Sequence, residues 1–276
     1  MAHIADYTGQ TFRGSEKFKK SRFAFWLSNS KIQKRGMKMT ALQKVQFESI
    51  HDCLHKDILR HETRVAETLR ILAGFLPSDI CFGYGLSDEA LQTAFYKGGL
   101  YHDVGKILFD HRLFRTKSGN VSITIRTRLH QHPNISADLL NEFASGIFDN
   151  EAERRICVDI ARHHRKRIDG KGYPVEINAT ISLSAQLCNL ADTFDDNIMN
   201  SPMLLGINHA FETAYKETMS DFGLVAQDAM DCFSAAKKEI KKKYCSKKSV
   251  FRNKRMLDMH RRISESQFRL SHNTEA

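Results

Sequence analysis

The residues of this chain with the most distinctive chemistry are histidines and aspartates that occur in a fixed order. The series is His61, His102, Asp103, His132, His163, His164 and Asp192. Imidazole nitrogens and carboxylate oxygens are ligands that suit divalent transition metals, and two such metals close together can hold a phosphate and generate hydroxide at neutral pH. The series therefore indicates a metal centre that hydrolyses a phosphoester.

The sequence around these residues separates them from ordinary surface histidines. An isolated His-Asp pair is weak support for a site, but here His102-Asp103 is followed directly by Val104-Gly105-Lys106. The second adjacent pair, His163-His164, leads into the segment Asp-Gly-Lys-Gly-Tyr-Pro at residues 169–174. The combination favours a functional site over a chance distribution of polar residues.

These motifs resemble the HD-GYP branch of the HD superfamily of metal-dependent phosphohydrolases. The matching stretches are residues 61–65, 100–107, 117–122, 132–133, 139–140, 163–164, 169–174 and 190–195. They follow the family's order and cover about the middle two thirds of the chain. The resemblance implies an all-helical domain whose metals hydrolyse cyclic dinucleotides, chiefly cyclic di-GMP.

The resemblance also implies how the ligands divide between two ions. Asp103 has two carboxylate oxygens and is the natural bridge between the ions. One ion takes its other ligands from His61, His102 and Asp192. The second ion takes its other ligands from His132, His163 and His164.

A third ion is implied by an acidic residue upstream of the series. Asp57 lies one helical turn before His61, so both side chains are expected on one face of a helix. Some family members have Glu at this place and bind a third metal with it; the alternative is an ordinary surface carboxylate. We therefore expect two or three divalent ions. Fe or Mn is favoured, and Zn, Co or Ni suit the same ligands.

Asp103 and Lys106 are the expected catalytic residues. The family lysine that matches Lys106 faces the scissile phosphate, where an ammonium binds a phosphoryl oxygen or donates a proton toward the departing 3′ oxygen. The alternative for Lys106 is a solvated lysine on an amphipathic helix. Gly105 is expected to permit a close helix approach, and Tyr173 of the Gly-Tyr-Pro loop is expected to contact substrate.

Two departures from the family pattern leave the nucleotide open. Arg165 follows the second His pair where the family usually has Glu, and residues 201–204 read Ser-Pro-Met-Leu where the family often has Arg-Pro-Tyr-Arg. Lost arginines remove bidentate donors for phosphate and guanine. Arg165 and Lys171, with Lys166 and Arg167 beside them, are candidates to bind the same anion from the other side.

Three functions follow from this pattern. The first is a phosphodiesterase acting on a cyclic dinucleotide, favoured by the ligand series together with the Gly-Tyr-Pro loop. The second is an HD phosphohydrolase acting on another nucleotide or on nucleic acid, favoured by the altered pocket. The third is a catalytically silent nucleotide-sensing module. The complete set of metal ligands counts against this third function, because a pure interaction surface does not need them.

The elements that must position these residues are predicted to be helices. Apolar residues recur at steps of three and four over residues 41–76, 88–100, 122–143, 151–164, 182–199 and 208–219. Only four prolines occur, and no sustained alternation of apolar and polar residues suggests a sheet. The expected fold is all-α, a helical bundle of the HD superfamily with basic N- and C-terminal extensions.

Charge divides the chain into three expected parts. Residues 237–262 contain 12 Lys or Arg against two acids, and residues 13–38 contain nine against one, within a net charge of +10. We expect a basic extension at 1–40, the metal-binding bundle at 41–236 and a basic tail at 237–276. The tail is either a solvated helix or a cationic arm that docks on nucleic acid or another polyanion.

The remaining sequence features predict a cytoplasmic protein. No apolar run approaches the roughly 18–20 residues of a membrane span, and the first ten residues lack the apolar stretch of a secretory signal. The six cysteines are scattered without a Cys-x-x-Cys pair, which favours reduced thiols. The oligomeric state stays open.

Overall fold

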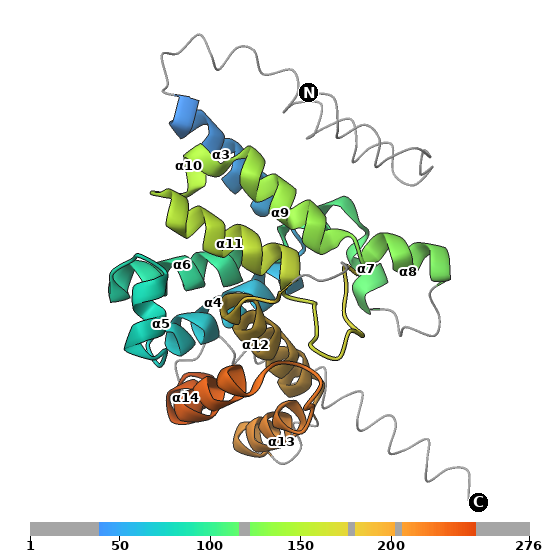
Figure 1. Cartoon of the computed structure of the whole chain (residues 1–276). Helices are drawn as coiled ribbons and strands as arrows, with labels where there is room; N and C mark the ends of the chain where they lie inside the picture. Colours follow the sequence, from blue (N-terminus) through green and yellow to red (C-terminus); the bar gives the residue numbers. More distant parts are fainter. Residues whose placement is uncertain (1–38, 116–121, 176–179, 202–205, 247–276) are drawn as a thin grey trace, which may run out of the picture.

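The protein is an assembly of helices in the residues that its structure describes. The structure is a computed structural model, and it describes residues 39–115, 122–175, 180–201 and 206–246. Within these ranges no residue forms a strand, so the expected all-α fold is confirmed (Figure 1). The described part includes no helix with the length and apolar composition needed to cross a membrane. Most of the N-terminal extension, residues 117–121 of the motif at 117–122, and residues 202–204 and 247–276 lie outside the described residues.

Most of the long helices follow the ranges predicted from the apolar spacing, whereas the helix at residues 227–245 and several short helices lie outside those ranges. In chain order the elements are α3 (Met39–His51), α4 (Lys56–Ala73), α5 (Ser78–Gly83), α6 (Asp88–Tyr101), the 3-10 helix η4 (Val104–Leu108), α7 (His111–Arg115), α8 (Ile123–Leu129), α9 (His132–Glu142), α10 (Ala144–Ile147), α11 (Glu151–His163), α12 (Leu183–Asn200), α13 (Ile207–Met219) and α14 (Gln227–Cys245). Figure 1 shows α12, α13 and α14 together at one end and α3, α9 and α10 at the other.

Two of the predicted helical ranges are each interrupted. The range 41–76 divides between α3 and α4, where the side chain of His55 accepts a hydrogen bond from the backbone N–H of Asp57 and caps the start of α4. The range 122–143 divides between α8 and α9 just before Pro133, which lacks an N–H and is suited to the first turn of a helix. The second interruption places His132 at the first position of α9.

Close contact between α4 and α6 brings the first two motifs together. A Cβ atom at Gly99 of α6 would lie 2.7 Å from the Cα of Ala66 on α4, and one at Gly98 would lie 2.5 Å from Ile160 of α11. Real Cβ atoms do not approach so closely, so Gly99 allows the backbones of α4 and α6 to pack at this distance, and Gly98 makes room for the Ile160 side chain. The packing fixes His61 of α4 beside the end of α6, where His102 follows.

The apolar core consists of two clusters that share α11. The larger cluster packs α4 and α6 against α12, α13 and α14, and Ile160 is its fully buried contribution from α11. The smaller cluster joins α3, η4 and α9, and here the neighbouring Ala161 is buried. Because consecutive helical residues point in different directions, α11 contributes buried side chains to both clusters and lies between them.

The C-terminal helix extends the bundle past the boundary expected at Ala236. That residue lies in the middle of α14, and Phe233, Ile240 and Tyr244 on the same side of the helix are buried in the larger cluster. Lys237 and Lys241 lie 2.9 and 2.7 Å from the carboxylate of Glu212 on α13. The first nine residues assigned to the basic tail are therefore part of the folded bundle, with several of their charges paired.

Candidate metal centre

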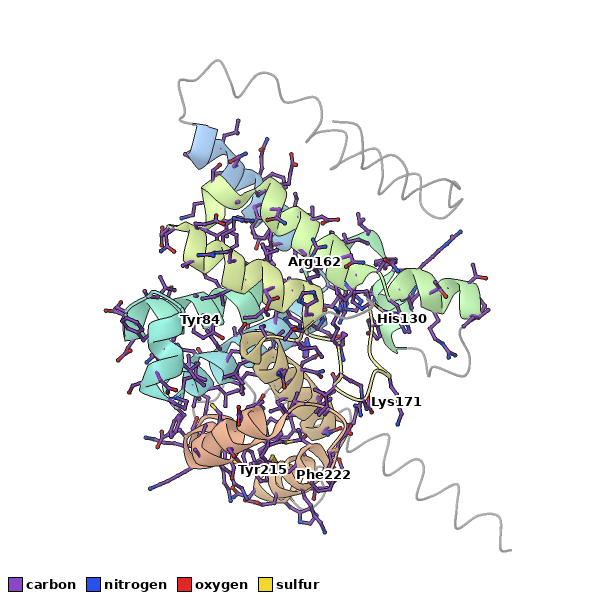
Figure 2. All side chains as sticks on the ribbon, viewed as in Figure 1. Tyr84, His130, Arg162, Lys171, Tyr215 and Phe222 are labelled. Carbon is purple, nitrogen blue, oxygen red and sulfur yellow. The ribbon has the colours of Figure 1, made fainter. Side chains whose placement is uncertain are left out.

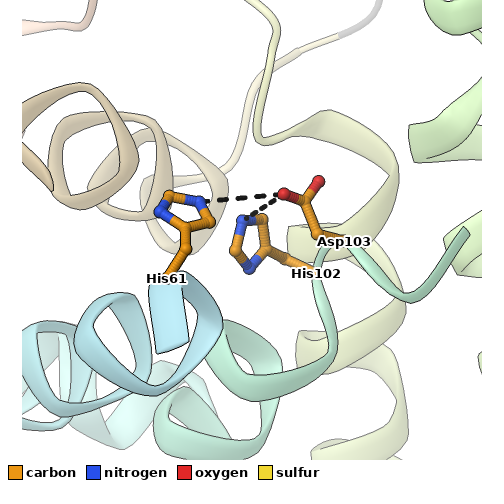
Figure 3. A group of neighbouring side chains, drawn as sticks. All are labelled: His61, His102 and Asp103. Carbon is orange, nitrogen blue, oxygen red and sulfur yellow. Dashed lines mark ion pairs between the residues drawn. The ribbon is translucent and has the colours of Figure 1, made fainter. Parts of the chain in front are cut away.

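Most of the predicted ligands converge on the carboxylate of Asp103. They come from four helices and the segment between α6 and η4: His61 from α4, His102 and Asp103 from the segment after α6, His132 from α9, His164 from the end of α11 and Asp192 from α12. Figure 3 shows His61 and His102 with their ring nitrogens directed at Asp103. Side chains more than 100 residues apart in sequence therefore form one cluster.

The two oxygens of Asp103 face different sets of imidazoles. Oδ1 lies 3.2 Å from Nε2 of His132 and 3.5 Å from Nε2 of His164. Oδ2 lies 3.4 Å from Nε2 of His102 and 3.7 Å from Nε2 of His61. A carboxylate with one group of donors at each oxygen has the arrangement that a bridging ligand between two ions requires.

Asp192 joins the group at Oδ2 of Asp103. Its Oδ1 lies 3.0 Å from Nε2 of His61, and its side chain is fully buried. His102, His164 and Asp192 have donor atoms within 4.8 Å of one another, as do Asp103, His132 and His164. Each set includes three side chains suited to a divalent transition metal.

Three of the histidines are oriented by the same local hydrogen bond. In His102, His132 and His164, Nδ1–H donates to the backbone carbonyl three residues earlier. The acceptors are Gly99, Leu129 and Ala161, at 2.7, 2.8 and 2.9 Å. Each histidine lies at a helix end, where such a carbonyl is accessible. Because Nδ1 carries the proton, Nε2 presents its lone pair to the centre, as a metal ligand must.

Buried acceptor atoms at the centre fit a bound cation. His102, Asp103 and His164 are fully buried. Nε2 of His102, Nε2 of His164 and Oδ1 of Asp103 have no hydrogen-bonding partner among the residues that the structure describes. Buried polar atoms without a partner cost roughly 1–3 kcal/mol each. Divalent cations would satisfy these acceptors, so the donor set fits metal binding.

The pKa values follow from burial and from the neighbouring charges. Burial lowers the pKa of His132 to about 4 and that of His164 to about 3, so both rings are neutral at pH 7. Burial acts against the ionised form of Asp103, but the positive charge of Lys106 holds its pKa well below the usual range. Neutral imidazoles around an ionised carboxylate are the protonation states that metal binding needs.

His61 is oriented by a carboxylate that the sequence did not single out as a site residue. Its Nδ1 donates to Oδ2 of Asp195 at 2.7 Å, while its Nε2 faces Asp192. Burial lowers the pKa of His61, but hydrogen bonds to Asp192 and Asp195 outweigh it and raise the pKa to about 10. A metal at Nε2 would therefore displace a proton. The signal in the sequence was the i, i+3 spacing of the two aspartates, which places both on one face of α12.

Two buried cations lie against the ligand carboxylates. The ammonium of Lys106 donates a hydrogen bond to Oδ2 of Asp103. Nη2 of Arg165 lies 2.9 Å from Oδ2 of Asp192, and 21% of the Arg165 side chain is exposed. The predicted substrate-binding residues Lys106 and Arg165 therefore lie at the centre. Both can reach an anion bound there.

The Gly-Tyr-Pro loop folds back over the centre. The N–H of Tyr173 donates to the carbonyl of Arg165 at 3.0 Å. The Tyr173 ring stacks on His130, with centroids 3.9 Å apart, and lies edge-on to His132 at 5.9 Å. A Cβ at Gly172 would lie 2.4 Å from the carbonyl oxygen of Arg165, so the fold requires glycine there. Tyr173 is thus beside the candidate ligands, in contact with His130, a histidine outside the predicted ligand series.

Three predicted site residues are not brought into the cluster. His163 donates from Nδ1 to Asp159 at 2.7 Å; it precedes His164 by one helical residue and so points in a different direction. Asp57, with 38% of its side chain exposed, lies 3.7 Å from Arg60. Lys171 is 81% exposed and projects from the loop (Figure 2).

Asp196 is an additional acidic residue at the edge of the centre. Its carboxylate lies within 4.8 Å of donor atoms of His61 and Asp192, and 3.8 Å from Nη1 of Arg165. Desolvation of the carboxyl group and the charge of Asp192 raise the pKa of Asp196 above its ordinary value, while 54% of its side chain is exposed. Its i, i+4 spacing from Asp192 was the signal in the sequence.

Comparison with known proteins agrees with the fold and the geometry of the centre. The family model of the HD domain matches residues 58–197, which is just over half of the chain and includes every residue of the cluster around Asp103. The chain therefore belongs to the HD domain family. The membership of the HD superfamily predicted from the motifs is confirmed, and the relatives described next support its HD-GYP branch.

Similar curated proteins are phosphodiesterases of cyclic dinucleotides. A cyclic di-GMP phosphodiesterase of Vibrio cholerae is 29% identical over 136 residues, covering 49% of this chain and 27% of that protein. A 3′3′-cGAMP-specific phosphodiesterase 1 of the same species is 27% identical over 163 residues, covering 59% and 34%. A cyclic di-GMP phosphodiesterase of Thermotoga maritima is 29% identical over 183 residues, covering 66% and 45%. The chain thus spans less than half the length of these relatives.

Proposed function

We propose that this protein is a metal-dependent phosphodiesterase that hydrolyses a cyclic dinucleotide, cyclic di-GMP or a related molecule, to a linear dinucleotide or mononucleotides. The observation that carries the proposal is Asp103, whose two buried oxygens each face two imidazole Nε2 atoms. The activities of the similar curated proteins support the substrate class.

Two divalent ions, with Fe or Mn favoured, are proposed to bind on either side of Asp103. His61, His102 and Asp192 would hold one ion, and His132 and His164 the other. His61, Asp192 and Asp196 form a further group of donors that suits a third ion. When bound, such ions supply hydroxide at neutral pH and offset negative charge on phosphoryl oxygens.

Three side chains of this chain are proposed to handle the substrate. Lys106, held against Asp103, is placed to bind a phosphoryl oxygen and to deliver a proton to the departing 3′ oxygen. The planar guanidinium of Arg165 can donate hydrogen bonds to two oxygens of one phosphate. Tyr173 covers the centre and limits access of water from the side of the loop.

Hydrolysis profiling of the full-length protein tests the proposal. The metal-free protein is loaded with Mn²⁺ or Fe²⁺ and supplied with cyclic di-GMP, 3′3′-cGAMP, linear dinucleotides, or single-stranded DNA or RNA. Chromatography of the products should show a linear dinucleotide or mononucleotides from at least one cyclic dinucleotide. Exclusive cleavage of the other substrates would contradict the proposed substrate class, and metal uptake without any hydrolysis would indicate a silent sensing module.

A second candidate is an HD phosphohydrolase for another nucleotide, and Arg165 is the observation that favours it. This arginine lies against Asp192 with 21% of its side chain exposed, where the family pattern usually has an acidic residue. An added positive charge at the centre suits a substrate with more negative charge than a cyclic dinucleotide, such as one with a terminal phosphate. Faster turnover of linear than of cyclic dinucleotides would support this candidate.

A further inference from the structure

We propose that Tyr244 of the C-terminal helix is a positioning residue of the metal centre: its hydroxyl holds Asp195, and Asp195 in turn orients His61. Tyr244 lies outside residues 58–197, the part matched by the HD domain. The inference rests on the metal centre of the proposed function. It adds a residue from another part of the chain to the residues that control metal binding.

The carboxylate of Asp195 accepts hydrogen bonds from three side chains on two other helices. His61 of α4 donates to Oδ2 at 2.7 Å. Arg64, one turn further along α4, donates from Nε to Oδ1 at 2.6 Å and from Nη2 to Oδ2 at 2.7 Å. Tyr244 of α14 donates to Oδ1 at 3.0 Å. Asp195 itself belongs to α12, so this carboxylate connects α12 to both α4 and α14.

The hydroxyl of Tyr244 has a distinct place in this network. Arg64 and His61 both come from α4, so their two contacts with Asp195 can shift together if α4 moves relative to α12. Tyr244 supplies the only contact from α14 among the hydrogen bonds described for Asp195, and it approaches the oxygen that His61 does not use. It therefore restricts rotation of the carboxylate, which sets the direction of the His61 ring.

The tyrosine ring is fixed firmly enough to position its hydroxyl. Tyr244 is 2% exposed. Its ring packs edge-on against Phe194, with centroids 5.2 Å apart, and against Phe211 at 6.3 Å. Burial and the charge of Asp195 raise the pKa of Tyr244 well above its ordinary value, so the hydroxyl keeps its proton and remains a donor. A rigid donor aimed at a buried carboxylate is a pre-organised support for a metal ligand.

The effect of Tyr244 on metal binding should be modest but specific. Removal of the direct partner of a metal-binding histidine typically lowers metal affinity about 10- to 100-fold. Tyr244 acts one hydrogen bond further away, and loss of one such bond corresponds to about a fivefold change in an equilibrium constant. The ion on the His61 side of Asp103 should be affected, and the ion held by His132 and His164 should not.

The experiment compares Tyr244→Phe with a matched change in the same core. Tyr244→Phe keeps the ring and removes only the hydroxyl. Tyr215→Phe makes the same change in a tyrosine of the same apolar cluster, whose ring stacks on Phe233. Full-length, metal-free proteins are titrated with Co²⁺ alone, and both the affinity and the visible absorption of the bound ion are measured. A purely structural role in α14 would lower the melting temperature without changing the Co²⁺ spectrum.

A double variant tests whether Tyr244 acts through Asp195. Asp195→Asn should weaken one Co²⁺ site more than Tyr244→Phe does, and the double variant should bind like Asp195→Asn alone. We expect Tyr244→Phe to lower the affinity of one ion about fivefold and to alter its spectrum, with Tyr215→Phe unchanged. Wild-type binding and spectrum in Tyr244→Phe, or losses that multiply in the double variant, would overturn the inference. Failure of the wild-type protein to bind metal would instead overturn the proposed function.

Discussion

Arg165 lies with its Nη2 2.9 Å from Oδ2 of Asp192, so a guanidinium is paired with a carboxylate that is also a candidate metal ligand. Both side chains are largely buried. An arginine in this place can neutralise Asp192 or contact an anion above the centre, and it repels a cation close to it. The balance between these contacts makes Arg165 a sensitive test of how substrate is bound.

Replacement of Arg165 should separate substrate binding from metal binding. Arg165→Gln is expected to lower kcat/KM about 10- to 100-fold, mainly through KM, because a charged hydrogen bond to phosphate is worth about 1.5–3 kcal/mol. Metal affinity should be unchanged or higher, since a positive charge beside Asp192 is removed. Steady-state kinetics and metal titration measure the two effects.

Arg162→Gln is the control for that experiment. Arg162 lies in the last turn of α11, three residues before Arg165, and pairs with Asp138 at 3.1 Å. Exposed ion pairs contribute little, so kinetics and metal binding should match the parent. Wild-type kcat/KM in Arg165→Gln would remove Arg165 from the substrate site.

Lys106 and Lys171 are predicted to differ strongly in their effect on turnover. Lys106 is bonded to Asp103 at the centre, whereas Lys171 is 81% exposed. Lys106→Met should lower kcat about 10²- to 10³-fold while metal is retained, because a general acid contributes about that much. Lys171→Met should change kcat/KM only slightly. An equally large loss of turnover in both variants would mean that the loop carries Lys171 into the site during turnover.

Gly105 is predicted to be essential for the close approach of η4 and α9. A Cβ at this position would lie 2.4 Å from the carbonyl oxygen of His132 and 2.6 Å from the N–H of Ser136. Gly105→Ala should therefore destabilise the protein by about 1–3 kcal/mol and displace His132. Gly83→Ala is the control, because a Cβ there meets no atom within 4 Å. Thermal unfolding should show a lower Tm for Gly105→Ala alone; equal Tm values would contradict the packing described.

Truncation should distinguish the folded part of the C-terminal region from the rest. A chain that ends at Ser246 keeps α14 and is expected to retain metal binding and hydrolysis. A chain that ends at Ala236 loses Ile240 and Tyr244 from the core, at a cost of roughly 2–5 kcal/mol for each large buried side chain. The helical signal in circular dichroism and the bound metal should therefore be lost only in the chain that ends at Ala236. A fully active chain ending at Ala236 would contradict the role given to α14.

The chain that ends at Ser246 also tests whether the basic tail docks on polyanions, which is one of the two alternatives for the tail. Residues 247–262 contain seven Lys or Arg, and the lysines before them are partly paired with the bundle. If the tail binds nucleic acid, the full chain should bind more tightly than the chain ending at Ser246, with affinity that falls steeply as salt rises. Equal binding by both forms across a salt series would leave the tail as a solvated segment.

The helices and most of the metal centre could be predicted because their signals are local. The apolar spacing gave the ranges of α6, α11, α12 and α13 to within a few residues. Residue type, order and the flanking motifs together marked His61, His102, Asp103 and Asp192, since few arrangements other than a metal site use such a series. The interruptions before α4 and α9 were not foreseen because a capping histidine and a proline at a first turn leave the apolar period almost unchanged.

The rest of the site depends on contacts that no spacing in the sequence reveals. Tyr244 and Asp195 are 49 residues apart and meet only because α14 packs on α12 and α4. The sequence pattern around His130 indicates an ordinary surface residue, whereas in the structure the loop folds back and Tyr173 stacks on its ring. The basic composition after Ala236 suggested a separate tail. The many lysines on one face of α14 made the apolar residues on its other face difficult to recognise as part of the core.

The most direct test of the central claim is the metal content and activity of Asp103→Ala beside the wild-type protein. Both are purified as full chains, loaded with Mn²⁺ under identical conditions and assayed for metal-to-protein ratio and for hydrolysis of cyclic dinucleotides. If Asp103 bridges two ions, the wild-type protein should hold at least two ions per chain, and Asp103→Ala should lose metal and show no measurable hydrolysis. Full metal occupancy with near-parental activity in Asp103→Ala would contradict a metal centre built around this carboxylate.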